Sequence, residues 1–284
     1  MEKRLYTHCN IDLDAVASLW AVKTFIPCMA DAVLVFMPAN WDGYEMGLYD
    51  FAVDIEAGGK GVKGEKGENG IVHSCFASLI RKYASKKDQE ALHSLVTFID
   101  AQDAHGNAVM HLAGATLSED NKKILGMTGI NAVLRALQST HRGDDALVAS
   151  RMAEIFNGML KAGRARQRAK VEAEKAEISQ SGKVAIVRNN KEFATNAILF
   201  DNGIEFIIYV DGYNIGIIRK NSQTISTSDD AFQAVVAENN ELQEWFAHPA
   251  GFLFCRGSRK APATTPSKVN PLKLAKAAEK LLKE

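Results

Sequence analysis

Apolar and polar residues along the first half of the chain alternate in a way that predicts strands and helices in turn. Short runs rich in β-branched and aromatic residues predict strands at 4–9, 32–37 and 49–55. Longer apolar or amphipathic segments predict helices at 15–25, 74–83, 89–99, 131–137 and 146–160. Strands that alternate with helices at this spacing indicate an α/β fold, with a parallel-sheet N-terminal domain and crossover helices.

The pattern changes after residue 160. Lys161 to Ser179 is rich in Ala, Arg, Lys and Glu, which predicts a solvated helical connector. Beyond it we expect strands at 184–187, 197–200, 205–210 and 213–219, and helices at 232–246 and from about 271. The chain therefore divides into a first domain at 1–160, a helical connector at 161–180 and a smaller mixed α/β C-terminal domain at 181–284.

The amino-acid composition excludes several classes of protein. The 284 residues include 34 basic and 34 acidic ones, so the formal net charge is +0 and bulk attraction to nucleic acid is excluded. The four cysteines lie far apart without a CxxC pair, which favours reduced thiols over a zinc ribbon or a disulfide framework. Without a secretory leader or a run of about 18 apolar residues, we expect a cytoplasmic protein with no membrane partner.

The strongest chemical signal is the segment His8-Cys9-Asn10-Ile11-Asp12-Leu13-Asp14, where a strand runs into a turn just before a helix. One imidazole and two carboxylates form a ligand set that suits Mn²⁺ or Mg²⁺ better than a metal that prefers thiolates. The alternative is a turn with a capping Asp and an exposed His. We expect the fold to survive without the carboxylates of Asp12 and Asp14.

The same segment resembles motif one of the DHH phosphoesterase superfamily, H-x-N-P-D-x-D-A-x-x-S. The matching residues, with Ile11 at the usual proline position, are His8, Asn10, Asp12, Asp14, Ala15 and Ser18. The resemblance implies a parallel-sheet domain that binds one or two Mn²⁺ or Mg²⁺ ions. It also implies a smaller substrate-binding domain joined by a helical connector.

The resemblance extends to further acids. Asp54, at the end of a predicted strand, resembles the bridging aspartate of motif two, and Asp100 or Asp103 resembles motif four. Each could instead be a turn or helix-end carboxylate. The Asp-His-His triplet that names the superfamily is absent, and His73 is either its substitute as a metal ligand or a helix-entry residue.

The C-terminal domain contains a run that loosely resembles the superfamily's substrate loop. His248 and Gly251 precede a basic segment that contains Arg256, Ser258, Arg259 and Lys260. Glycine allows close approach of the backbone to a phosphate, and the basic and hydroxyl side chains offer hydrogen-bond donors to its oxygens. The alternative is a solvated basic loop.

A glycine-rich, charged segment at 58–70 follows the third predicted strand. It is too short and too poor in proline for collagen, and we expect a mobile loop. Ligands bind at the carboxyl ends of strands in α/β folds, so this loop either covers the substrate or is a plain surface loop.

Together these features predict a metal-dependent phosphoesterase or nuclease. His8, Asp12, Asp14 and Asp54 would form the catalytic site, in which a metal-activated water attacks the phosphodiester. The partner would be a phosphorylated small molecule or a nucleic-acid end. The phosphodiester substrate would be a nucleic-acid end, a short oligonucleotide or a nucleotide. One alternative is a catalytically inactive nucleotide- or nucleic-acid-binding module of the same fold, and another is an interaction protein that uses the connector and basic tail. The sequence leaves a homodimer open.

Overall fold

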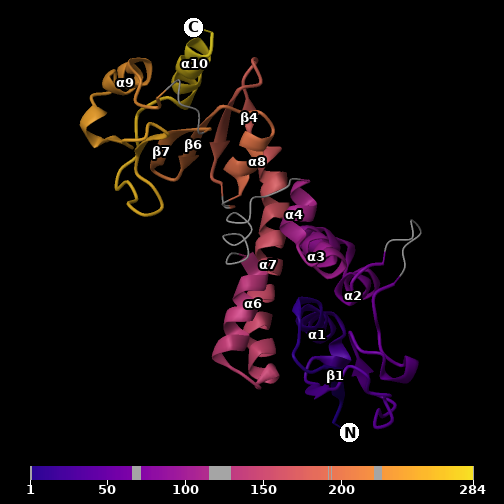
Figure 1. The fold of residues 1–284 in the computed structure, drawn as a ribbon. Helices are drawn as coiled ribbons and strands as arrows, with labels where there is room; N and C mark the ends of the chain where they lie inside the picture. Colours follow the sequence, from indigo (N-terminus) through magenta and orange to yellow (C-terminus); the bar gives the residue numbers. More distant parts are fainter. Residues whose placement is uncertain are drawn as a thin grey trace. The chain divides into compact units, whose positions relative to one another are not determined.

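The computed structural model describes residues 2–65, 72–114, 129–190, 192, 194–220 and 226–283 (Figure 1). Its contacts divide the chain into two compact units, Met1–Arg164 and Ala165–Glu284, which are considered separately below. None of the described helices is long and apolar enough to cross a membrane.

The N-terminal unit contains a three-stranded parallel sheet in the order β2-β1-β3. Its strands are β1 Arg4–His8, β2 Val33–Met37 and β3 Phe51–Ala52. The third strand is shorter than the run at 49–55 suggested. Asp50 accepts hydrogen bonds from the backbone of Gly47 and Arg4, which holds a turn directly before Phe51. Parallel pairing places the carboxyl ends of β1 and β3, and therefore His8 and Asp54, at one edge of the sheet.

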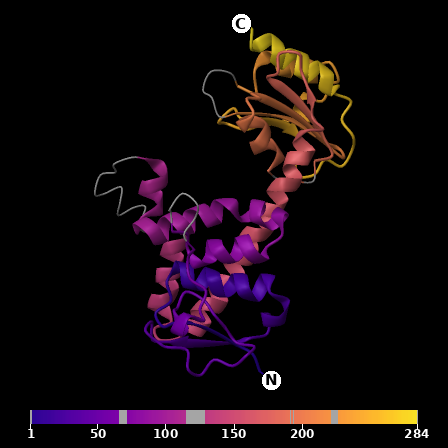
Figure 2. The ribbon, with the colours of Figure 1, turned by 90° about the vertical axis from the view of Figure 1, so that its right-hand side faces the viewer.

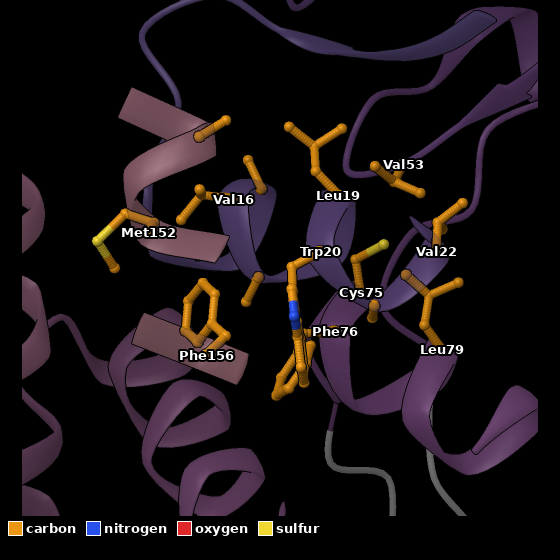
Figure 3. Close-up of a cluster of buried hydrophobic side chains, with 14 of the residues drawn as sticks. Val16, Leu19, Trp20, Val22, Val53, Cys75, Phe76, Leu79, Met152 and Phe156 are labelled. Carbon is orange, nitrogen blue, oxygen red and sulfur yellow. The ribbon is translucent and has the colours of Figure 1, made fainter. Parts of the chain in front are cut away.

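The helices of this unit pack on one another, and α1 contacts β1 of the sheet. Their bounds are α1 Leu13–Phe25, α2 Cys75–Tyr83, α3 Lys86–His105, α4 Ala108–Ala113, α6 Gly129–Thr140 and α7 Asp145–Ala173, with short 3₁₀ turns η1 Pro27–Met29 and η2 Ala57–Gly59. The main core lies between α1, α2 and α7, where Trp20 packs against Phe76 and Phe156 (Figure 3). The Trp20 indole also donates to Asn157, so its polar atom is satisfied.

The first part of the glycine-rich segment is tightly packed, in contrast to the mobile loop that we expected. The Val62 backbone pairs with the residues around Val53, and a Cβ at Gly61 would lie 1.9 Å from the Ile55 carbonyl oxygen. A Cβ at Gly64 would lie 1.7 Å from the His73 carbonyl oxygen. These glycines are therefore required for close backbone approach, and residues 66–70 of the segment lie outside the described residues.

The predicted helix at 146–160 and the predicted connector are one continuous helix, α7 Asp145–Ala173. Ala and long charged side chains dominate its second half, and these residues have high helix propensity. The helix ends before β4 Glu177–Ile178, a short strand that the sequence pattern did not indicate.

The C-terminal unit is a mixed α/β unit around a six-stranded sheet in the order β4-β5-β6-β7-β9-β8. The remaining elements are β5 Val184–Arg188, α8 Thr195–Asp201, β6 Phe206–Asp211, β7 Asn214–Arg219, α9 Asp230–Ala237, η3 Leu242–Glu244, β8 Phe246–Ala247, β9 Leu253–Arg256 and α10 Pro271–Leu281. Helices α9 and α10 pack together, and α10 lies along β5 and β6 (Figure 2). Phe232 and Leu274 of these helices complete a core with Ile217 of the sheet.

Two predicted elements of this unit were wrong. The run at 197–200 belongs to helix α8, where Ile198 and Leu199 pack against Ala169 of α7. Four consecutive apolar residues do not distinguish a strand from a buried helix. The predicted helix at 232–246 ends at Ala237, and the chain then forms η3 and the edge strand β8.

Candidate metal centre and anion site

Three of the sequence-predicted ligands meet at the carboxyl edge of the N-terminal sheet. His8 ends β1, Asp12 is the N-cap residue of α1, and Asp54 follows β3. The His8 Nε2 atom lies 3.2 Å from Asp54 Oδ2 and 4.0 Å from Asp12 Oδ2. One ligand atom from each residue falls within 4.8 Å of the other two. The side chain of Asp12 is 61% exposed, so solvent and ligands reach the cluster.

The local hydrogen bonds direct the His8 ring toward the carboxylates. The Nδ1 atom lies 2.9 Å from the Cys9 carbonyl oxygen, an acceptor that fixes the Nδ1–H tautomer of neutral His8. The hydrogen bond to Asp54 raises the pKa of His8 to about 9, with smaller contributions from Cys9 and from the Asp12 charge. The lone pair of Nε2 is thus available once a cation displaces the proton.

An imidazole and two carboxylates that converge from three segments fit Mn²⁺ or Mg²⁺. Capping of α1 explains the position of Asp12, but it does not explain Asp54, which follows β3 in a left-handed backbone conformation with φ 51°. Such a conformation in a non-glycine residue is strained and is often found at functional sites. We infer that His8, Asp12 and Asp54 would hold the cation.

Asp14 has a second role that the sequence did not indicate. It is 4% exposed, and its two oxygens accept hydrogen bonds from the backbone nitrogens of Cys75 and Phe76, at 2.8 and 2.9 Å. Asp14 therefore satisfies the free N–H groups at the start of α2. Burial and the nearby Asp54 charge raise the pKa of Asp14 to about 8, despite these hydrogen bonds.

The two candidates of motif four occupy different environments. Asp100 accepts hydrogen bonds from Ser74 N and Oγ, at 2.9 and 2.6 Å, and lies 2.8 Å from His73 Nδ1. Asp103 lines a cavity with Asp12 and Asp14. Although the Asp103 side chain reaches solvent, burial by neighbouring atoms and the charges of Asp54, Asp12 and Asp100 raise its pKa.

The turn that contains Asp12 is fastened to the helices beside it. The Asn10 backbone N–H donates to Asp145 at the start of α7, at 2.9 Å. The Gln138 side chain of α6 donates to the Ile11 carbonyl oxygen at 2.7 Å. Asn10 has φ 54°, so these hydrogen bonds hold a turn whose backbone conformation is unfavourable for most residues. Sequence reasoning missed both contacts because they join residues that lie far apart in the chain.

In the C-terminal unit, Arg256 occupies a structural position. It is 6% exposed, and its guanidinium contacts Glu244 and Thr265. Each nitrogen of the guanidinium contacts a residue of the same unit, so the arrangement does not favour the substrate role expected for Arg256. Neighbouring Ser258 accepts from the Ala261 N–H in a tight turn.

The other predicted substrate residues lie in two turns. His248 and Gly251 belong to the connection between β8 and β9, where Gly251 has φ 65° and packs against Ser226. Arg259 donates to the Asn190 carbonyl oxygen at 2.6 Å, and Lys260 is exposed beside it. Arg259 and Lys260 are exposed, His248 is half-buried and Gly251 is buried, so the described residues do not form one substrate site here.

Arg219, which sequence reasoning missed, is the unusual cation of this unit. It is 8% exposed and lies on the same face of β7 as Ile215 and Ile217, the face that packs into the core. Its Nε and Nη1 atoms have no hydrogen-bond partner among the described residues. Its backbone donates to the Phe252 carbonyl oxygen, which places it beside the predicted His248–Phe252 loop. The only sequence signal was an Arg at an inward-facing position of an apolar strand.

A scan of family models and a search of curated proteins returned no match. A search of solved structures found RecJ from Thermus thermophilus in complexes with Mn²⁺ and with Mg²⁺, both at a TM-score of 0.33. The identities are 11% and 10%, and the alignments cover 97% of this chain and 52% and 50% of the RecJ chains. This chain thus spans about half the length of the structures it matches, and the assignments below rest on its own residues. The two RecJ alignments extend along nearly the whole of this chain.

Proposed function

We propose that the protein is a metal-dependent phosphoesterase that hydrolyses a phosphodiester. The observation that carries the proposal is the convergence of His8, Asp12 and Asp54 within 4.8 Å of one another at the carboxyl edge of the sheet. Mn²⁺ or Mg²⁺ bound there would activate a water for attack on phosphorus. The substrates that fit are nucleic-acid ends, short oligonucleotides and nucleotides.

The chain's own residues would complete the site in two ways. Asp103 borders the same cavity as Asp12 and is the next carboxylate available to a cation. Asp14 also borders it, but both of its oxygens accept hydrogen bonds from the backbone of α2. His73 is paired through Nδ1 with Asp100, the arrangement that commonly orients a metal-ligating imidazole through its second nitrogen. We therefore assign Asp100 to orientation of His73 and Asp103 to direct ligation. His73 would substitute for the imidazoles of the missing triplet.

Arg219 provides the C-terminal unit with an anion site of its own. A buried guanidinium without a partner is unfavourable, and burial lowers its pKa. A phosphate oxygen would supply the missing acceptors and the opposite charge. This supports a role for the unit in binding phosphorylated molecules.

The experiment is hydrolysis of bis(p-nitrophenyl) phosphate, with Mn²⁺ and with EDTA. The wild type should release p-nitrophenol only with the metal, and Asp54→Asn should lose at least about 100-fold in kcat/KM. Asn tolerates the backbone conformation of Asp54 but is a poorer cation ligand. The matched control is Asp31→Asn, an exposed acid before β2, which should retain full activity.

The inactive-module alternative makes the opposite prediction. If the wild type binds Mn²⁺ but hydrolyses neither this diester nor an oligonucleotide, the site binds without catalysis. If hydrolysis persists equally in Asp54→Asn, the activity belongs to other residues and the proposal is wrong.

A further inference from the structure

A cavity of about 410 Å³ adjoins the metal-binding cluster inside the N-terminal unit. Residues 10–14 of the β1–α1 turn form one wall, α3 forms a second and α6 forms a third. The cavity shares Asp12 with the cluster of His8, Asp12 and Asp54. A ligand in the cavity would therefore lie beside the metal-binding cluster.

The floor of this cavity is aliphatic. Ile11, Leu13, Ile99 and Leu134 line it, and all four are at most 4% exposed, so they present a fixed apolar surface. Ligand cavities typically combine such a surface with a few placed polar groups. The floor suits a flat, neutral group, and its size suits a single nucleoside.

The polar groups of the cavity differ in their availability. Gln138 donates to the Ile11 carbonyl oxygen, and Gln102 bonds to the backbone of Gly106 and Ala108, so their amides are partly engaged. Asn131 and Arg135, one turn apart on α6, have no side-chain hydrogen bond to the other described residues. An Asn amide matches the paired donor and acceptor at the edge of a nucleobase.

The charged side chains that line the cavity determine which phosphorylated ligands fit it. Three carboxylates, Asp12, Asp14 and Asp103, line the cavity, but Arg135 is the one cationic side chain among its described lining residues. A chain of phosphates in this cavity would place its negative charges against those carboxylates. A nucleoside brings no charge of its own, and its phosphate would lie toward the metal.

We propose that this cavity binds the nucleoside next to the scissile phosphate, with Asn131 at the edge of the base and Arg135 at the cavity mouth. The protein would accordingly prefer nucleotide esters over polyphosphates and over simple diesters. The effect of this cavity on kcat/KM rests on the proposed phosphodiester hydrolysis. Binding of a nucleoside in the cavity does not depend on that activity.

The test compares bis(p-nitrophenyl) phosphate with the p-nitrophenyl esters of the 5′-monophosphates of adenosine, guanosine, cytidine and uridine. These esters share a leaving group, so a difference in kcat/KM reports on the nucleoside. The wild type should prefer at least one nucleoside ester by about tenfold or more. Asn131→Leu and Arg135→Ala should each reduce this preference, measured as the ratio of the two kcat/KM values, at least about threefold. Arg142→Ala, an exposed arginine outside the cavity, should change nothing.

A second measurement separates failure of this inference from failure of the proposed function. Calorimetry with the four uncharged nucleosides and metal-free protein needs no hydrolysis. Binding that is lost in Asn131→Leu supports the cavity even if the protein hydrolyses no diester. An absence of any nucleoside preference in active wild type, or a preference unchanged in both variants, overturns the proposal. So does an inactive protein that binds none of the four nucleosides.

Discussion

Asp12 and Asp14 are separated by one residue, yet the structure gives them different roles. Asp12 is exposed and caps α1 through a hydrogen bond to the Ala15 N–H, whereas Asp14 is buried beneath α2. The sequence pattern identified both as ligands and treated both as dispensable for folding. The second expectation does not hold for Asp14, because its role depends on Cys75 and Phe76, which lie far along the chain.

The Asp12→Ser variant should separate ligation from folding. Serine is a good N-cap, so the free energy of unfolding should change by less than about 1 kcal/mol. The carboxylate is lost, so Mn²⁺ affinity should fall at least about tenfold. Chemical unfolding measures the free energy of unfolding, and calorimetric titration of the same protein measures the Mn²⁺ affinity. Equal Mn²⁺ affinity in wild type and Asp12→Ser would remove Asp12 from the site.

Asp14→Ala should destabilise the fold even without metal. The change leaves two buried N–H groups of α2 without acceptors, so the free energy of unfolding should fall by at least about 2 kcal/mol. Urea unfolding in EDTA measures the difference, with Asp12→Ser as the matched control. Unchanged stability would mean that the hydrogen bonds of Asp14 contribute nothing to the fold.

The metal-free protein should lose stability as the pH rises from about 6 to about 9. Asp14 has its pKa raised to about 8, so the folded state binds its proton more tightly than the unfolded state, and stability falls from about pH 4 through pH 8. His8 has its pKa raised to about 9, so its contribution is full below pH 6.5 and is lost through pH 9. Melting temperatures in EDTA at both ends of this range test the prediction. A melting temperature that rises across it would contradict the two raised pKa values.

At the scale of elements, α6 and α7 determine how the ligand turn is held. Gln138 and Asp145 bond to the backbone of Ile11 and Asn10, directly before Asp12. Such support around a metal site commonly contributes about 10- to 100-fold in affinity. The helices themselves were predictable from apolar periodicity, but their contacts with the turn were not.

Gln138→Leu should therefore weaken Mn²⁺ binding about tenfold while keeping all proposed ligands. The substitution keeps the side-chain volume and removes the donor to Ile11. Ser139→Ala, on the exposed side of α6, is the control and should bind Mn²⁺ as the wild type does. If Gln138→Leu binds Mn²⁺ normally, the turn holds its geometry without α6.

Sequence reasoning succeeded where local pattern determines structure. Strand β1, the α1 helix and α10 follow from periodicity, and the clustering of His8 with Asp54 follows from the edge geometry of parallel strands. It failed where tertiary packing decides between alternatives. Helix α8 forms from a strand-like run because Ile198 and Leu199 pack against α7, and the glycine-rich segment is ordered through Gly64 by backbone contacts with His73.

In the whole molecule, each of the two units has its own hydrophobic core and its own candidate binding site. The N-terminal unit contains the cluster around His8 and the core around Trp20. The C-terminal unit contains Arg219 beside the core around Phe232. A divalent cation and a phosphate should therefore bind to different units of the chain.

Hydrogen exchange should resolve the two responses. Mn²⁺ should protect backbone amides in residues 4–18 and 52–62, and inorganic phosphate should protect those around Arg219 and His248–Phe252. Arg219→Met should abolish the phosphate response and leave the Mn²⁺ response unchanged, because it removes the charge and keeps an apolar chain in the core. Phosphate protection that persists in Arg219→Met would assign the anion to another site.

Equilibrium dialysis against Mn²⁺ measures, without any substrate, whether His8, Asp12 and Asp54 bind a divalent cation. Metal content per chain should be at least one in the wild type and in the control Asp31→Asn. It should fall close to zero in Asp54→Asn at a Mn²⁺ concentration that saturates the wild type, while circular dichroism shows an intact fold. A wild type that takes up no Mn²⁺ or Mg²⁺, or an Asp54→Asn variant that binds as much metal as the wild type, would mean that these three residues do not form a metal site.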